Sequence, residues 1–127
     1  MDCYQTVMLD FAKEHYFLAQ SRGMFDPTFD VAAKVTLNKS YAYYGKNGYR
    51  IDLNVTSMIR EAVNDAISQG VDFSKYYVNG KVPNIIVYYA GCGEATGGDE
   101  NTIWPHEMDY STSYGTKYSY HCKMFNR

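Results

Sequence analysis

Hydrophobic residues between positions 55 and 69 recur at intervals of three and four, which is the spacing of one helix face. Polar residues fill the intervening positions, and Gly70 follows where a left-handed residue commonly ends a helix. Asn54 or Thr56 can cap the start. The pattern predicts a helix whose apolar stripe packs against a sheet. The stripe consists of Val55, Met58, Ile59, Ala62, Val63, Ala66 and Ile67.

Residues 2–20 show the same spacing in their first half, so we predict a second helix there. Asp2 can cap this helix and Gly23 can end it. The pattern becomes irregular after His15, whose neighbours are polar. We therefore expect His15 to be exposed rather than to bind a metal.

Three segments have the pattern of strands. Residues 25–38 place apolar side chains at odd positions and polar ones at even positions, which is typical of a half-buried antiparallel strand. Pro27 favours an edge position or a later start for it. Residues 85–90 form an apolar run bounded by proline and glycine, as in a buried strand. A weaker alternation at residues 117–122 allows a further strand at an edge.

These elements predict an α/β (α+β) fold, with a mixed twisted sheet of about four strands and two packed helices. A chain of 127 residues is long enough for one domain with a modest core. We expect a single domain over residues 1–127, with residues 109–127 as a tail that forms an edge or is flexible. Tyrosine and glycine at residues 41–49 predict a loop, and Asn79-Gly80 predicts a tight turn.

A glycine-rich acidic loop separates the apolar run from a short apolar piece at residues 102–106, which carries the only tryptophan. Residues 83–108 read PNIIVYYAGCGEATGGDENTIWPHEM. The loop is too long for a tight hairpin and too polar for a core. Long loops in compact domains are commonly functional, so we look for function here.

Charge and hydropathy exclude two classes of partner. The net charge is −2 and the 12 basic residues are scattered, whereas nucleic acids and anionic membrane surfaces require clustered Lys and Arg. No apolar stretch approaches the roughly 18 residues that span a bilayer. The 14 tyrosines suit packing with the hydroxyl turned to water, or contact with carbohydrate or peptide.

The string YAGCGEATGGDENTIWPHEM resembles the segment just before the catalytic helix in the immune-inhibitor-A family of secreted bacterial zinc metallopeptidases. Further segments match in the same order: FLAQSRGMFDPTFDV, VTLNKSYAYYG, MIREAVNDA and VDFSKY. The similarity covers residues 16–108. It implies the amino-terminal part of a zincin-like fold, a peptide or protein substrate, zinc in the complete domain, and secretion or display at the cell surface.

The zinc-binding motif of that family is absent. Those enzymes carry H-E-x-x-H, in which two histidines one helical turn apart bind zinc and the glutamate activates water. His106-Glu107 begins such a motif, but Tyr110 stands where the second histidine is needed. Residues 76–83 also lack the family's acidic, calcium-like turn. We predict no catalytic residue, no cofactor and no hydrolysis for this chain alone.

The first residues lack the basic start and apolar core of a signal peptide. Since the resemblance implies a secreted parent, we expect the start of this chain to lie inside a longer domain.

By resemblance, Asn101, Thr102, Ile103 and Trp104 correspond to the exposed strand above a zincin cleft, which pairs with extended substrate through its backbone. Trp104 would add an apolar contact, and Pro105 would end the pairing. The alternative is that Trp104 anchors the core.

The acidic loop contributes a second set of candidates, Glu94, Asp99 and Glu100. These carboxylates could bind a cation or a basic substrate group, or one could act as a general acid. The alternative is a solvated loop held by its own backbone hydrogen bonds. The resemblance places the loop beside the active-site cleft of the parent enzymes but assigns none of the three a catalytic role.

Cysteine and histidine offer weaker metal candidates. A zinc site from Cys92, His106, His121 and Cys122 is conceivable, but the spacings match no zinc finger and the adjacent pair diverges on a strand. His106 and His121 are therefore weak candidates only. A cysteine protease centred on Cys92 lacks a third member. In an oxidising compartment Cys92–Cys122 is the favoured disulfide, with Cys3 left over, although the sequence does not establish it.

The sequence thus predicts a non-catalytic fragment or degenerate form of a secreted zinc metalloendopeptidase domain, contributing a substrate-facing edge strand and loop. The alternative is a peptide- or protein-binding module with no link to proteolysis. A partial domain exposes apolar surface, so we also expect self-association.

Overall fold

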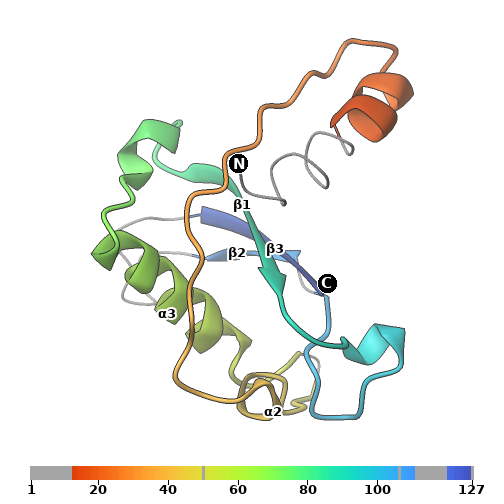
Figure 1. The fold of residues 1–127 in the computed structure, drawn as a ribbon, viewed down its shortest axis with the longest axis vertical. Helices are drawn as coiled ribbons and strands as arrows, with labels where there is room; N and C mark the ends of the chain where they lie inside the picture. The colour runs from red at the N-terminus through yellow and green to blue at the C-terminus, as the bar shows by residue number, and fades with distance from the viewer. Residues whose placement is uncertain (1–12, 50, 106, 111–119, 127) are drawn as a thin grey trace. The chain divides into compact units, whose positions relative to one another are not determined.

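The computed structural model describes residues 13–49, 51–105, 107–110 and 120–126 (Figure 1). The chain forms two compact units, Met1–Lys34 and Val35–Arg127. That residues 1–127 are one domain with a flexible tail at 109–127 stays a prediction.

The described part of the first unit starts with a π-helical turn, η2 (Lys13–Leu18), which continues for two more helical residues. Gly23, with a φ of 80°, ends the helix by donating its N–H to the Leu18 carbonyl at 2.7 Å. This confirms the predicted end at Gly23. His15 is exposed, as predicted, whereas Asp2 lies outside the described residues.

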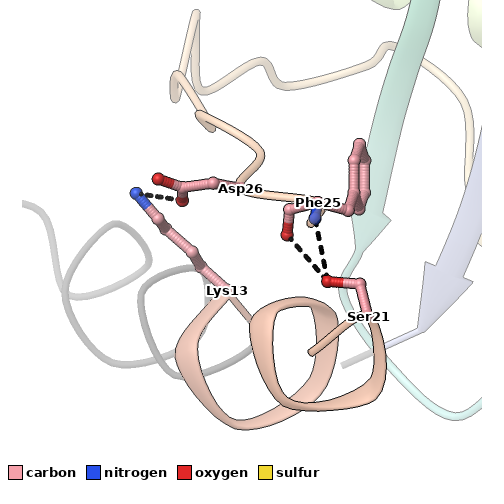
Figure 2. Close-up of polar contacts among 4 residues, drawn as sticks. All are labelled: Lys13, Ser21, Phe25 and Asp26. Atoms are coloured by element: carbon pink, nitrogen blue, oxygen red, sulfur yellow. Dashed lines mark hydrogen bonds and ion pairs between the residues drawn. The ribbon is translucent and has the colours of Figure 1, made fainter. Parts of the chain in front are cut away.

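Short-range contacts hold the chain after this helix (Figure 2). Ser21 Oγ accepts a hydrogen bond from the Phe25 N–H at 2.8 Å, and Lys13 Nζ lies 2.7 Å from the Asp26 carboxylate. The ion pair is partly exposed, so solvent weakens its contribution to stability. The rings of Phe17 and Phe25 meet edge to face with centroids 5.5 Å apart.

Residues 25–38 form no strand with any described residue, so the predicted edge strand is not found. Their burial nevertheless alternates as the sequence predicted, with half-buried odd positions and exposed even positions from residue 27 onward. Alternation shows which side faces the protein, whereas a strand also requires a neighbouring backbone to pair with. The sequence pattern therefore predicted which side chains are buried, but it could not predict whether another strand pairs with this segment.

A short helix, α2 (Tyr41–Tyr44), occupies the segment predicted to be a loop. Ser40 caps it, because its Oγ accepts a hydrogen bond from the Tyr43 N–H at 3.4 Å. The chain then turns back on itself, and an isolated antiparallel bridge joins Asn47 to Asp52. This turn leads directly into the main helix.

The main helix, α3 (Val55–Ser68), confirms the clearest element of the sequence pattern. Every member of the predicted stripe except Ile67 is buried, and Ile67 is 37% exposed. Asn54 precedes the helix but does not cap it; its side-chain amide donates to the Tyr43 carbonyl at 2.8 Å. Gly70, with a φ of 93°, follows the end as predicted.

A tight turn leads into the sheet after a short 3₁₀ helix, η3 (Phe73–Tyr76). Asn79 and Gly80 have φ values of 49° and 82°, and Val78 and Lys81 exchange two backbone hydrogen bonds of 2.7 and 3.0 Å. Positive φ at both central residues is typical of a two-residue hairpin turn. The turn predicted at Asn79-Gly80 is confirmed.

The described sheet has three strands, β1 (Val82–Tyr89), β2 (Glu107–Tyr110) and β3 (Tyr120–Asn126). Their order is β1-β3-β2, with β1 parallel and β2 antiparallel to β3 (Figure 1). The sheet is mixed, as predicted, but a fourth strand is not found among the described residues. β3 lies at the centre, whereas the sequence predicted an edge for this part of the tail.

The described buried apolar side chains belong to the second unit and come from its helices, from β1 and from Ile103. They are Tyr44, Val55, Met58, Ile59, Ala62, Val63, Ala66, Phe73, Val82, Tyr89 and Ile103. Helices and a mixed sheet in one chain make a small α+β fold. This core also fixes the end of the acidic loop, since Ile103 belongs to it.

Candidate functional site

The segment predicted to be an edge strand, residues 101–104, is an irregular stretch in which two side chains are buried. Thr102 is 6% exposed and Ile103 2%, whereas Trp104 is 43% exposed. Asn101 is half-buried. The predicted substrate-binding residues therefore separate into two that face the protein and two that solvent reaches.

The peptide unit that joins Ile103 to Trp104 is hydrogen-bonded at both ends. Its carbonyl oxygen, on Ile103, accepts from the Tyr89 hydroxyl at 2.7 Å and from the Glu94 N–H at 3.2 Å. Its N–H, on Trp104, donates to Asp52 Oδ2 at 3.0 Å. Tyr89 lies at the end of β1, and Asp52 lies just before α3. Distant parts of the second unit thus hold one peptide plane.

Asp52 is 1% exposed, and the turn that carries it is itself well bonded. The Leu53 N–H donates to the Lys46 carbonyl at 2.8 Å, and the Gly48 N–H donates to the Ile51 carbonyl at 3.1 Å. Burying a carboxylate is costly unless hydrogen bonds compensate. The hydrogen bond that Asp52 accepts from the Trp104 N–H provides part of this compensation.

Gly45 allows the turn after α2 to approach the segment directly. A Cβ at this position would lie 2.5 Å from the Asn101 carbonyl oxygen and 2.8 Å from the Ile103 nitrogen. These are backbone atoms, which cannot move aside as a flexible side chain can. Glycine at position 45 is therefore a steric requirement for the placement of residues 101–103.

Several hydrogen bonds within the acidic loop hold its backbone. Asp99 Oδ1 accepts from the Asn101 N–H at 2.8 Å, and the Asp99 carbonyl accepts from the Thr102 hydroxyl at 2.7 Å. The first part of the loop forms a 3₁₀ turn, η4 (Glu94–Thr96). Glu94 is half-buried and Glu100 is exposed. The three candidate carboxylates are thus unequal in exposure and bonding.

Two buried tyrosines have raised pKa values, which keeps their hydroxyl groups available as donors. Burial raises the pKa of Tyr89, and the nearby Asp52 carboxylate raises it further. Burial, with the hydrogen bond to Glu61, raises the pKa of Tyr44 to about 12. A phenol of ordinary pKa is already protonated at neutral pH, so the raised pKa extends to more alkaline pH the range in which Tyr89 donates to the Ile103 carbonyl.

No group of three or more His, Cys, Asp or Glu side chains lies close enough to share a metal ion among the residues that the structure describes. His106 lies outside those residues, and of His121 only the backbone is described, paired with Asp109. The absence of a cofactor stays a prediction.

Cys92 is exposed and carries a free thiol, so the favoured Cys92–Cys122 disulfide is not formed. In the sheet, Cys122 pairs with Ile85, in the first half of β1, whereas Cys92 follows the end of that strand. The strand's length therefore separates the two backbones. Cys3 lies outside the described residues.

An open hollow of about 370 Å³ lies beside α3, away from the predicted site residues. Its lining is mostly polar and comprises Thr36, Leu37, Asn38, Glu61, Asn64 and Asp65. Trp104 does not line it, so the exposed indole is a surface feature and not part of this hollow.

No family model, curated protein or solved structure matches this chain. The likeness to immune-inhibitor-A peptidases therefore remains an inference from the residues quoted above. No helix in the described part of the chain has the length and hydropathy to cross a bilayer.

Sequence reasoning missed the residues that hold the candidate segment, namely Gly45, Asp52 and Tyr89. Asp52 carried a faint signal, since it is a lone carboxylate between Ile51 and Leu53 just before a strong helix. Gly45 and Tyr89 carried none, because their partners lie far along the chain.

Proposed function

We propose that this chain is a non-catalytic, peptide-contacting part of a secreted or cell-surface domain of the zinc metalloendopeptidase type. Its contact with peptide is centred on Trp104. Zinc belongs to the complete domain of the resembled family and not to this chain. The resemblance supplies the class of domain, and the arrangement of the Trp104 segment supplies the point of contact.

The proposal rests mainly on one observation. The side chain of Trp104 is exposed to solvent, while hydrogen bonds to buried side chains hold its backbone in place. Trp104 is 43% exposed although its own N–H is bonded to a carboxylate that is 1% exposed. An aromatic ring offers a large contact area at a small cost in conformational entropy when its backbone is already ordered. Such side chains dominate the energetics of protein interfaces.

The geometry also limits how a peptide can bind. The Ile103 carbonyl and the Trp104 N–H are used inside the fold, so they are not offered to a passing strand. Pro105 has no N–H to donate. A peptide would therefore contact the Trp104 ring and the half-buried Asn101, rather than extend a backbone ladder along residues 101–104. Glu100, which is exposed and directly precedes Asn101 in the chain, favours a basic residue in that peptide.

The test is peptide binding followed through the only tryptophan of the chain. A fluorescein-labelled pool of octapeptides that alternate apolar and basic residues is titrated with the purified chain. We expect saturable anisotropy of the label and a change in tryptophan emission. Trp104→Ala should weaken binding at least about tenfold, as truncation of an interface aromatic typically does.

Tyr77→Ala is the matched control, because Tyr77 is 45% exposed and lies before the turn at Asn79-Gly80 instead of in the candidate segment. We expect it to bind the same pool as tightly as the unaltered chain does. Equal affinity of Trp104→Ala and the unaltered chain would refute Trp104 as the point of contact.

A second candidate, a binding module unrelated to proteolysis, is favoured by the same internal hydrogen bonds. A substrate strand of a zincin requires free backbone groups along the edge, and the Ile103–Trp104 peptide unit has none to offer. Both candidates place peptide contact at Trp104. They differ in whether the complete protein contains a zinc site that hydrolyses peptides.

A further inference from the structure

The peptide unit between Ile103 and Trp104 is held from opposite sides by two buried side chains. The Tyr89 hydroxyl donates to its oxygen at 2.7 Å and the Asp52 carboxylate accepts from its nitrogen at 3.0 Å. Tyr89 is 7% exposed and Asp52 is 1% exposed. They lie 37 positions apart in the chain, so their meeting at one peptide unit is a product of the fold.

A peptide plane bonded at both its oxygen and its nitrogen cannot rotate without breaking a bond. Trp104 also precedes Pro105, and the residue before a proline is restricted to extended backbone conformations. The backbone of Trp104 is thus constrained on both sides. The direction in which its side chain leaves the surface is set by these constraints, and only the side-chain torsions remain free.

The chemical identity of the two side chains matters for this arrangement. Asp52 presents a charged acceptor, which forms a stronger hydrogen bond than a neutral acceptor does. Tyr89 presents a hydroxyl that donates to the Ile103 carbonyl at 2.7 Å, and burial with the neighbouring Asp52 raises its pKa, which extends this donation to more alkaline pH. Both side chains bond to the one peptide unit that leads from buried Ile103 to exposed Trp104.

We propose that Asp52 and Tyr89 are a pair of positioning residues that fix the Trp104 backbone and thereby set the affinity of the peptide contact. The effect on peptide affinity rests on the proposed function. The effect on the Trp104 ring does not, since it concerns this chain alone.

The first experiment measures acrylamide quenching and steady-state anisotropy of the single tryptophan. Asp52→Ala and Tyr89→Phe should each raise the quenching constant and lower the anisotropy, because the indole gains freedom. Asp52→Asn retains an amide oxygen that can accept from the Trp104 N–H, so it should restore most of the original signal. The double variant Asp52→Ala/Tyr89→Phe should show less than the sum of the two effects, since both act on one peptide unit.

Tyr44→Phe is the matched control, because it removes a buried hydroxyl that bonds to Glu61 and not to this segment. We expect its tryptophan signal to match that of the unaltered chain. Far-UV circular dichroism confirms that each variant is folded. If Asp52→Ala fails to fold, Tyr89→Phe still decides the outcome, because it removes only the hydroxyl that donates to the Ile103 carbonyl.

The second experiment repeats the octapeptide titration with the same variants. Loss of one buried hydrogen bond should weaken binding by about five- to tenfold. An unchanged tryptophan signal in folded Tyr89→Phe, or an equal change in Tyr44→Phe, overturns the positioning pair. If the unaltered chain binds no peptide but the quenching results are as expected, then Asp52 and Tyr89 do position Trp104, and the proposed function is wrong.

Discussion

Tyr44 and Tyr89 use their hydroxyl groups inside the fold, whereas the composition predicted tyrosines with hydroxyls turned to water. Tyr44 is 2% exposed and donates to Glu61 Oε2 at 2.6 Å. Tyr89 donates to the Ile103 carbonyl. A buried hydroxyl with a partner stabilises the fold, and a buried phenolate would be strongly disfavoured. Both residues are therefore sensitive to strongly alkaline pH.

Alkaline pH should destabilise the fold through Tyr44. Its pKa is about 12 in the folded state, against the ordinary value of 10.0 when unfolded. The folded state thus binds more protons between pH 10 and pH 12, and the free energy of unfolding falls across that window. The protonated state below pH 10 retains the full contribution. The expected loss is about 3 kcal/mol, two pKa units at about 1.4 kcal/mol each.

The measurement is urea unfolding at a series of pH values for the unaltered chain and for Tyr44→Phe. Phenylalanine has no proton to lose, so the stability difference between the two proteins should shrink above pH 10. Other tyrosines titrate in both proteins and cancel in the difference. Parallel curves up to pH 12 would contradict a Tyr44 contribution.

At the scale of elements, the sequence predicted what depends on local pattern and missed what depends on distant partners. The α3 stripe and the turn at Asn79-Gly80 are local, and both are found. β1 was recognised from its run of β-branched and aromatic residues, which suits a strand. Residues 25–38 have a strand's alternation but no described ladder, and β3 is central despite its low hydrophobicity. Pairing depends on neighbours that no local pattern specifies.

The same limit applies to the candidate site. The sequence identified Trp104 and the acidic loop as noteworthy, but it could not separate exposed Trp104 from buried Ile103. That separation follows from the bonds made by Asp52 and Tyr89, which arrive from other elements. Contacts across such distances leave no spacing that a single sequence reveals.

α3 provides a paired test of burial within one helix. Ile59 is 0% exposed and Ile67 is 37% exposed. Ile59→Ala should lower the free energy of unfolding by about 2–5 kcal/mol, because it removes buried methyl groups and leaves a cavity. Ile67→Ala should cost about 1 kcal/mol or less. Chemical denaturation of both variants measures the difference, and equal losses would show that the helix buries a different face.

At the scale of the whole molecule, the chain contains two compact units and only the second has apolar residues that are buried among those described. Its net charge of −2 and scattered basic residues give no electrostatic attraction for nucleic acid. Its sequence contains no H-E-x-x-H, so water activation by zinc has no motif to support it here. The proposed non-catalytic, peptide-contacting role is consistent with both properties.

We expect the purified chain to cleave no fluorescent casein, with or without added Zn²⁺, and to retain no stoichiometric zinc after dialysis. The complete protein should differ. If the transcript encodes H-E-x-x-H downstream of residue 127, the longer product should cleave casein and lose activity with a chelator. A transcript without that motif would favour the binding module, and stoichiometric zinc in this chain would contradict the assignment of zinc to the complete domain only.

The position of β3 has a consequence for how the protein is made. Among the described strands, β1 and β2 do not pair with each other; each pairs with β3, which follows both in the chain. During synthesis β1, which ends at Tyr89, is therefore made well before the described strand that pairs with it, which begins at Tyr120. The described sheet cannot form before β3 has been synthesised, and a chain that stalls before that point would expose the unpaired backbone of β1, with the apolar side chains of Ile85, Ile86 and Val87, to chaperones or to other nascent chains.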